Sequence, residues 1–139
     1  MLQRIRIGFV VLIVSIMMTA TAGEMRPAVQ AEITSLLSRL ETSDCKFNRN
    51  GSWYSGAKAK AHMLTKLRYL EARTTLTSAE QFIELAATKS SVSGKPYLVQ
   101  CGDTPAQTSA EWLTTQLKSL RAVQRSGSSA SEAPAAGPQ

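Results

Sequence analysis

The sequence predicts a small α+β domain in which four helices pack on a three-stranded antiparallel sheet, in the order helix, β-hairpin, helix, helix, strand, helix. Three observations predict this fold. Apolar residues recur at helical spacing in four segments, an Asn-Gly pair separates two short strand-like runs, and two cysteines mark the first and the last strand. The chain of 139 residues is long enough for one domain.

The N-terminal segment 1–22 has the order of a secretory signal peptide. Arg4 and Arg6 precede an apolar run over 7–18, and the small residues Ala20-Thr21-Ala22 follow it, which predicts cleavage after Ala22. The apolar run is shorter than the roughly 20 residues that span a bilayer, so we expect no stable membrane span after cleavage. The predicted location is therefore periplasmic or secreted; the alternative is an uncleaved anchor.

The charge balance argues against a nucleic-acid partner. Removing 1–22 takes away two arginines and no acidic residue, which leaves 14 basic and 10 acidic residues and a net charge of +4. This charge is mild, and no long block of like charges forms an arm for nucleic acid. Export from the cytoplasm would separate the protein from nucleic acid in any case.

Cys45 and Cys101 are the two cysteines, and export would place them in an oxidising compartment. We therefore expect one disulfide between them. Closing so long a loop would stabilise the fold by about 4 kcal/mol, a large share of the roughly 5–15 kcal/mol typical of a domain. The alternatives are two free thiols or a bridge between two chains.

The first helix is predicted from Pro27 to Leu40 or Thr42, because proline suits an early helical position. Its apolar face consists of Val29, Ile33, Leu36, Leu37 and Leu40. The hairpin follows, since Asn50-Gly51 tolerates the positive φ of a type I′ turn and joins predicted strands at Cys45–Arg49 and Ser52–Tyr54.

A second helix is predicted over about Ser55 to Arg73, with Met63, Leu64, Leu67 and Leu70 on its apolar side. Thr77 with Glu80 has the pattern of a capping box, which predicts a third helix that runs to about Thr88.

The third strand is expected at Pro96–Cys101, and the cysteine positions favour antiparallel pairing with the first strand. A second capping box, Thr108 with Glu111, predicts the start of the last helix. From Ser126 the sequence is rich in Ser, Ala, Gly and Pro without apolar periodicity, so 126–139 is predicted to be a disordered tail and 23–125 the single domain.

The segment from Lys89 to Cys101 contains hydroxyl residues and a Gly-Lys pair, but it is not a nucleotide-binding P-loop. Pro96 follows Lys95 where a P-loop needs Ser or Thr, and the strand comes after the glycine instead of before it. The simpler prediction is a helix exit and a turn into the strand. The alternative is that Ser90 and Ser93, beside Lys95, hold a small anion or the carboxylate of a partner.

A second candidate site is a basic stripe on the second helix. At helical spacing, one face carries Lys58, His62, Lys66, Tyr69 and Arg73 and points away from the apolar side of that helix. Such a stripe could bind an acidic polymer or an anionic headgroup. The alternative is an ordinary solvated face.

The sequence offers little material for catalysis. It has one histidine, no G-x-S-x-G elbow and no cluster with metal-ligand spacing, so we predict no catalytic residue, no metal and no cofactor.

Four segments within about Glu32 to Leu120 carry a recognisable pattern: "FNRNGSWY", "AKAHMLTKL", "TSAEQFIELAATKSSVSGKPYLVQC" and "SAEWLTTQL". Together they resemble the DUF5329 family of small exported bacterial proteins of unknown function. The resemblance implies a periplasmic or secreted location and no established reaction or catalytic residue. It places His62, Lys66 and the segment from Ser93 to Tyr97 within the family's characteristic pattern.

The function predicted from these observations is a non-enzymatic binding or accessory module for an anionic envelope component or an acidic protein partner. The alternative is a small hydrolase of envelope polymers, or an inhibitor-like effector, that uses His62.

Overall fold

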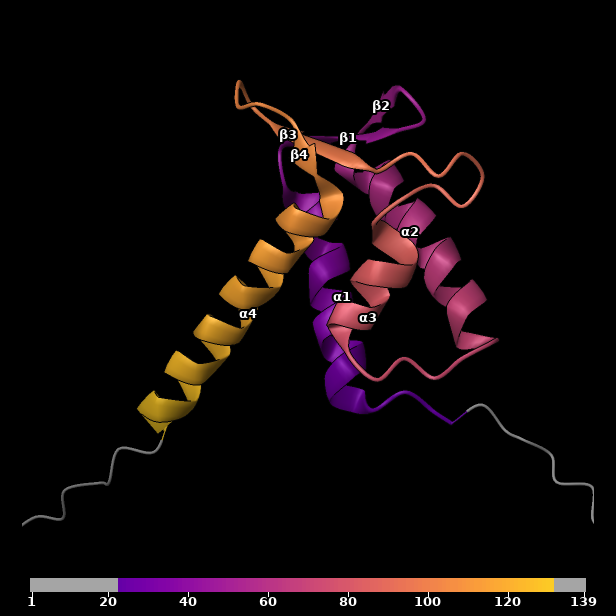
Figure 1. Ribbon diagram of the computed structural model, residues 1–139. Coiled ribbons are helices and arrows are strands. Elements are labelled where there is room, and N and C mark those ends of the chain that lie inside the picture. The colour runs from indigo at the N-terminus through magenta and orange to yellow at the C-terminus, as the bar shows by residue number, and fades with distance from the viewer. Residues whose placement is uncertain (1–22, 132–139) are drawn as a thin grey trace, which may run out of the picture.

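The computed structural model describes residues 23–131, and the predicted signal peptide lies outside them. Within this range the chain order is helix, hairpin, helix, helix, strand, strand, helix (Figure 1). The elements are α1 (Pro27–Thr42), β1 (Cys45–Arg49), β2 (Ser52–Tyr54), α2 (Gly56–Glu71), α3 (Ala79–Phe82) with the π-helix Ile83–Ala87, β3 (Leu98–Cys101), β4 (Gln107–Thr108) and α4 (Ser109–Ser131). None of the helices in this range is long and apolar enough to cross a membrane.

The sheet is antiparallel throughout, with the strand order β2-β1-β3-β4. The predicted turn is confirmed, because Asn50 and Gly51 have φ values of 54° and 85°. The predicted pairing is also confirmed, since Cys45 lies opposite Cys101 and forms a disulfide with it. The prediction of three strands is wrong: β4 is a fourth, and its two residues are too few to produce a recognisable alternation.

The sheet lies across one end of the helices, and α4 diverges from α1 towards its own C-terminal end (Figure 1). The helices bury their apolar faces against one another and against β1 and β3. The most deeply buried side chains come from every helix except α2, from β3 and from the segment before α3: Ile33, Leu36, Leu76, Phe82, Val99, Leu113 and Leu117.

Close contact between α1 and α2 requires glycine at the first position of α2. A Cβ atom on Gly56 would lie 1.9 Å from the carbonyl oxygen of Leu40. Ser55 caps α2, because its Oγ accepts a hydrogen bond from the Lys58 backbone N–H at 3.3 Å. These contacts fix where α2 begins and bring it under the hairpin.

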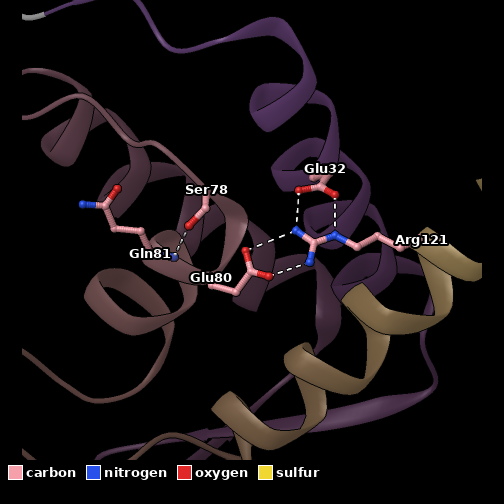
Figure 2. Close-up of polar contacts among 5 residues, drawn as sticks. All are labelled: Glu32, Ser78, Glu80, Gln81 and Arg121. Carbon is pink, nitrogen blue, oxygen red and sulfur yellow. Dashed lines mark hydrogen bonds and ion pairs between the residues drawn. The ribbon is translucent and has the colours of Figure 1, made fainter.

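The third helix starts one residue later than the capping box predicts. Ser78 is the N-cap, and its Oγ accepts a hydrogen bond from the Gln81 N–H at 3.1 Å (Figure 2). Gln81 in turn accepts a hydrogen bond from the Thr77 N–H at 2.8 Å, which is the contact that the predicted capping box assigns to Glu80. The helix continues as a π-helix to Ala87.

Glu80 instead belongs to an ion-pair network that ties three helices together (Figure 2). Arg121 of α4 donates to both carboxylate oxygens of Glu32 of α1, at 2.6 and 2.9 Å. It also donates to both oxygens of Glu80 of α3, at 2.5 and 3.1 Å. This network lowers the pKa of Glu80 and raises that of Arg121.

The last helix begins as predicted and ends later. Thr108 and Glu111 form the expected capping box, with the Thr108 hydroxyl donating to the Glu111 carboxylate at 2.7 Å. The helix runs to Ser131, so it includes residues 126–131, for which the sequence predicts no helix. Serine hydroxyls in this part of the helix donate to backbone carbonyls one turn earlier, as Ser126 does to Ala122. A helix that is exposed on all sides needs no apolar periodicity. Residues 132–139 lie outside the described range.

Candidate functional site

Two adjoining cavities open where the hairpin, α2 and the loop before β3 meet. The inner cavity has a volume of about 160 Å³, and the outer cavity has a volume of about 320 Å³. Arg49, Tyr54, His62 and Tyr97 line both cavities. We call the two cavities, with these four residues and the neighbouring Lys58 and Lys66, the cationic cleft.

His62 lies at the centre of the cationic cleft, and both of its ring nitrogens are engaged. Arg49 Nη1 is 2.6 Å from His62 Nδ1, and His62 Nε2 is 3.2 Å from the Tyr97 hydroxyl. A guanidinium can only donate, so Nδ1 accepts and the ring is neutral with its proton on Nε2. The half-buried position of the ring, then the charges of Arg49 and Lys66, lower the pKa of His62.

Lys66 approaches Tyr97 from the other side. Its ammonium donates to the Tyr97 hydroxyl at 3.3 Å and to the carbonyl of Lys89 at 3.2 Å, and it lies 5.1 Å from the Tyr97 ring centroid. Burial lowers the pKa of Lys66 and raises that of Tyr97, so the phenol keeps its proton at neutral pH. The Tyr97 oxygen accepts from two donors, which leaves its own proton available to a third group.

No acidic residue lines either cavity. Arg49 lies 5.1 Å from the ring centroid of Tyr54, and its proximity lowers the pKa of the Tyr54 phenol. The ion pairs among residues 23–131 involve Lys60 and Arg121, and neither belongs to the cleft. Arg49, Lys58 and Lys66 therefore carry positive charge here without a carboxylate partner in the described part of the chain.

Local structure explains how these side chains meet. Lys58, His62 and Lys66 are spaced by four residues, so they lie one above the other on α2. Arg49 ends β1 and is held in register opposite Ser52 by the hairpin. The hairpin therefore places Arg49 over the face of α2 that carries Lys58 and Lys66.

The loop before β3 closes the other side of the cleft. Its ends are joined by a hydrogen bond from the Tyr97 N–H to the carbonyl of Thr88 at 3.0 Å. Ser90 is buried, and its Oγ accepts from the N–H groups of Val92 and Ser93, each at 3.3 Å. The serine hydroxyl predicted to bind an anion thus holds the loop in shape.

The structure gathers part of the predicted site. Lys58 and His62 line the inner cavity, and His62, Lys66 and Ser90 line the outer one. Ser93 lies at the edge, where its hydroxyl donates to Asn50 Oδ1 at 2.5 Å.

Two predicted residues lie elsewhere. Lys95 is exposed and lines neither cavity. Arg73 lies in the turn just after α2, where its guanidinium stacks 3.5 Å from the Tyr69 ring centroid and donates to the Tyr69 carbonyl. The basic stripe is therefore two separate surfaces, and its C-terminal part does not reach the cleft.

Sequence reasoning did not assign Arg49, Tyr54 or Tyr97 to a site, nor did it predict the apolar floor of the inner cavity. That floor consists of Leu40, Phe47, Met63, Ala87 and Leu113. Arg49 and Tyr97 do lie in the segments that carry the family resemblance, and this was the available signal. In residues 23–131 no group of His, Cys, Asp and Glu is arranged to hold a metal ion.

The comparisons with known proteins agree with the resemblance. The family model DUF5329, described as a family of unknown function, matches residues 27–121. The uncharacterized protein YfeK of Salmonella typhimurium strain LT2 is 33% identical over 87 residues, which cover 61% of this chain and 71% of that protein. No solved structure gives a significant match. The chain belongs to the DUF5329 family.

Proposed function

We propose that this protein is a non-enzymatic binding module that holds an anionic group in the cationic cleft. The observation that carries the proposal is the convergence of Arg49, Lys58 and Lys66 on cavities lined by no acidic residue. Charge-assisted hydrogen bonds to an anion are about twice as strong as neutral ones, so such a cluster is well suited to anion capture.

The donors of the cleft exceed its acceptors. Arg49 has five N–H donors, and His62 takes one of them. The Tyr97 hydroxyl already accepts from His62 and Lys66, so its proton is free to donate. An anion between Arg49 and Tyr97 would accept from both and would supply the negative charge that the cluster lacks.

An anionic component of the cell envelope or an acidic protein is the partner class that fits the predicted export. The disulfide between Cys45 and Cys101 supports that location, since such bonds persist in oxidising compartments.

The contacts of His62 favour binding over hydrolysis. A general base must accept a proton from a nucleophile, but Nδ1 already accepts from Arg49 and Nε2 carries the proton. The lowered pKa of His62 also makes it a poor proton donor at neutral pH. Hydrolysis by His62 therefore stays a prediction, and none of the contacts that His62 makes in the cleft supports it.

The test is a titration of the ¹⁵N-labelled protein with sulfate, in which two-dimensional NMR measures the amide shifts at each sulfate concentration. We expect saturable shifts at the amides around Arg49, His62 and Tyr97. Lys66→Gln should weaken binding by about 10-fold or more, because hydrogen bonds to charged groups are worth about 1.5–3 kcal/mol. Lys118→Gln is the matched control, since Lys118 is exposed on α4 and lines neither cavity.

Equal weakening by Lys66→Gln and Lys118→Gln would show that only net charge matters. That result, or shifts that never saturate, would overturn the proposal.

A further inference from the structure

The inner cavity differs in chemistry from the outer one although they share a wall. Its floor consists of apolar side chains from the core, whereas Arg49, Lys58 and His62 lie along its rim. The outer cavity shares Arg49 and His62, and its remaining lining is mostly polar, with serines, Asn50 and Lys66. An anion held at Arg49 would therefore lie directly beside an apolar hollow.

The volume of the inner cavity sets the size of what can enter it. At about 160 Å³ it is comparable to an engineered protein cavity of about 150 Å³ that accepts benzene. A ring or a short alkyl chain of about six carbons is therefore the largest apolar group that fits. A long acyl chain exceeds this volume.

The floor is built by elements that are fixed independently of the cleft. Phe47 packs edge-on against Trp112 with ring centroids 5.6 Å apart, and Leu113 is almost fully buried. Ala87 ends the π-helix, and its small side chain leaves space where a larger residue would fill the cavity. The hollow is thus part of the folded core surface, not a gap between mobile side chains.

Resting on the proposed function, we infer that the cationic cleft binds a small carboxylate that carries a compact apolar group. The carboxylate lies against Arg49 and Lys66, and the apolar group enters the inner cavity. A planar guanidinium matches the two oxygens of a carboxylate. The apolar group of a carboxylate is attached directly to the charged group, so it can enter the inner cavity while the carboxylate stays beside Arg49, which lines both cavities. The Tyr97 hydroxyl supplies a further donor.

The experiment compares acetate, hexanoate and 1-hexanol as ligands of the whole mature protein by NMR titration. Hexanoate has four methylenes more than acetate, and burying each one strengthens binding by about fourfold. Because the cavity is partly open, we expect hexanoate to bind about 30- to 200-fold more tightly than acetate. Hexanol should bind at least about 10-fold more weakly than hexanoate, because it lacks the charge.

Ala59→Leu tests the cavity without removing a charge. Ala59 is half-buried on α2 and lines the inner cavity, so the larger side chain should fill it and abolish the preference for hexanoate. Acetate affinity should stay within about twofold, which also shows that the variant is folded. Ala61→Leu, the same change on the exposed face of α2, should leave both affinities unchanged.

The outcomes separate this inference from the proposed function. If sulfate binds in a Lys66-dependent way but hexanoate binds no more tightly than acetate, the inference is wrong and the proposed function stands. Hexanol binding as tightly as hexanoate, or an unchanged preference in Ala59→Leu, would also overturn the inference. If neither sulfate nor any carboxylate binds, both are wrong.

Discussion

The sole histidine gives a direct test of the charge arrangement in the cationic cleft. In the free protein, burial and the cations Arg49 and Lys66 disfavour the imidazolium form of His62 and lower its pKa. An anion bound between these cations would favour the imidazolium form. We therefore predict that saturating sulfate raises the pKa of His62.

The size of the effect follows from the contacts. Arg49 touches the ring, and Lys66 shares the Tyr97 hydroxyl with it, so an anion that contacts both cations lies within a few ångströms of the ring. At about 4 Å, two unit charges interact by about 1 kcal/mol in water and about 4 kcal/mol at an effective dielectric constant of 20. For a half-buried ring we expect about 1–2 kcal/mol.

Because protonation of His62 and sulfate binding are linked, the same interaction energy also changes the affinity for sulfate. Sulfate should bind about 5- to 30-fold more tightly to the form with His62 protonated, and the pKa of His62 should rise by the same free energy. The assay is the Hε1 resonance of His62, which is unambiguous because the chain has one histidine. It is followed between pH 4 and pH 8, with and without sulfate.

Two results would refute this reasoning. One is a His62 pKa in the free protein at or above about 6.5, the value of an unperturbed histidine. The other is a pKa that does not respond to sulfate. Arg49→Gln supplies the positive control, because removing one of the depressing charges should raise the pKa of His62 in the absence of any anion. Lys118→Gln should leave it unchanged.

Three further predictions concern the scaffold, and urea unfolding measures each. Replacing Cys45 and Cys101 together by Ala opens a loop spanning 56 residues and should lower the free energy of unfolding by about 4 kcal/mol; a loss below about 1 kcal/mol would contradict the chain-entropy account. Gly56→Ala should cost more than about 3 kcal/mol because of the clash with α1, whereas Gly127→Ala, with open space around it on α4, should stabilise the protein by up to about 1 kcal/mol. Arg121→Met should cost about 1–2 kcal/mol at low salt and clearly less in 1 M NaCl; a loss that does not depend on salt would show that packing, not charge, dominates.

The parts of the fold predicted from sequence are those determined by local chemistry. The Asn50-Gly51 turn, the proline at the start of α1 and the capping box at Thr108 each depend on residues a few positions apart. The strand β4 has no such signal, because its two residues acquire their role only by pairing with β3. The π-helix likewise depends on what Ile83 to Ala87 pack against, which local propensity does not report.

The candidate site was half predictable for the same reason. The spacing of Lys58, His62 and Lys66 places them on one face of a helix, and this inference needs no tertiary contact. The direction in which that face points does depend on tertiary contacts. Helical spacing predicts that His62 and Lys66 lie on a face directed away from the core, but the hairpin and the loop before β3 cover that face and bring Arg49 and Tyr97 into contact with these two residues.

The ion pairs of Arg121 and Lys60 indicate what an external anion would do in the cationic cleft. Arg121 is shared between two glutamates, and Lys60 forms an ion pair with Glu41. In the cleft, by contrast, Arg49 and Lys66 lie near the same histidine without a carboxylate partner in the described residues; burial lowers the pKa of Lys66, and burial followed by these two charges lowers the pKa of His62. An anion bound between Arg49 and Lys66 would supply the negative charge that Glu32 and Glu80 supply to Arg121, and would favour the charged form of each cleft residue. Replacing Lys66 by Gln should therefore weaken anion capture far more than it weakens the fold.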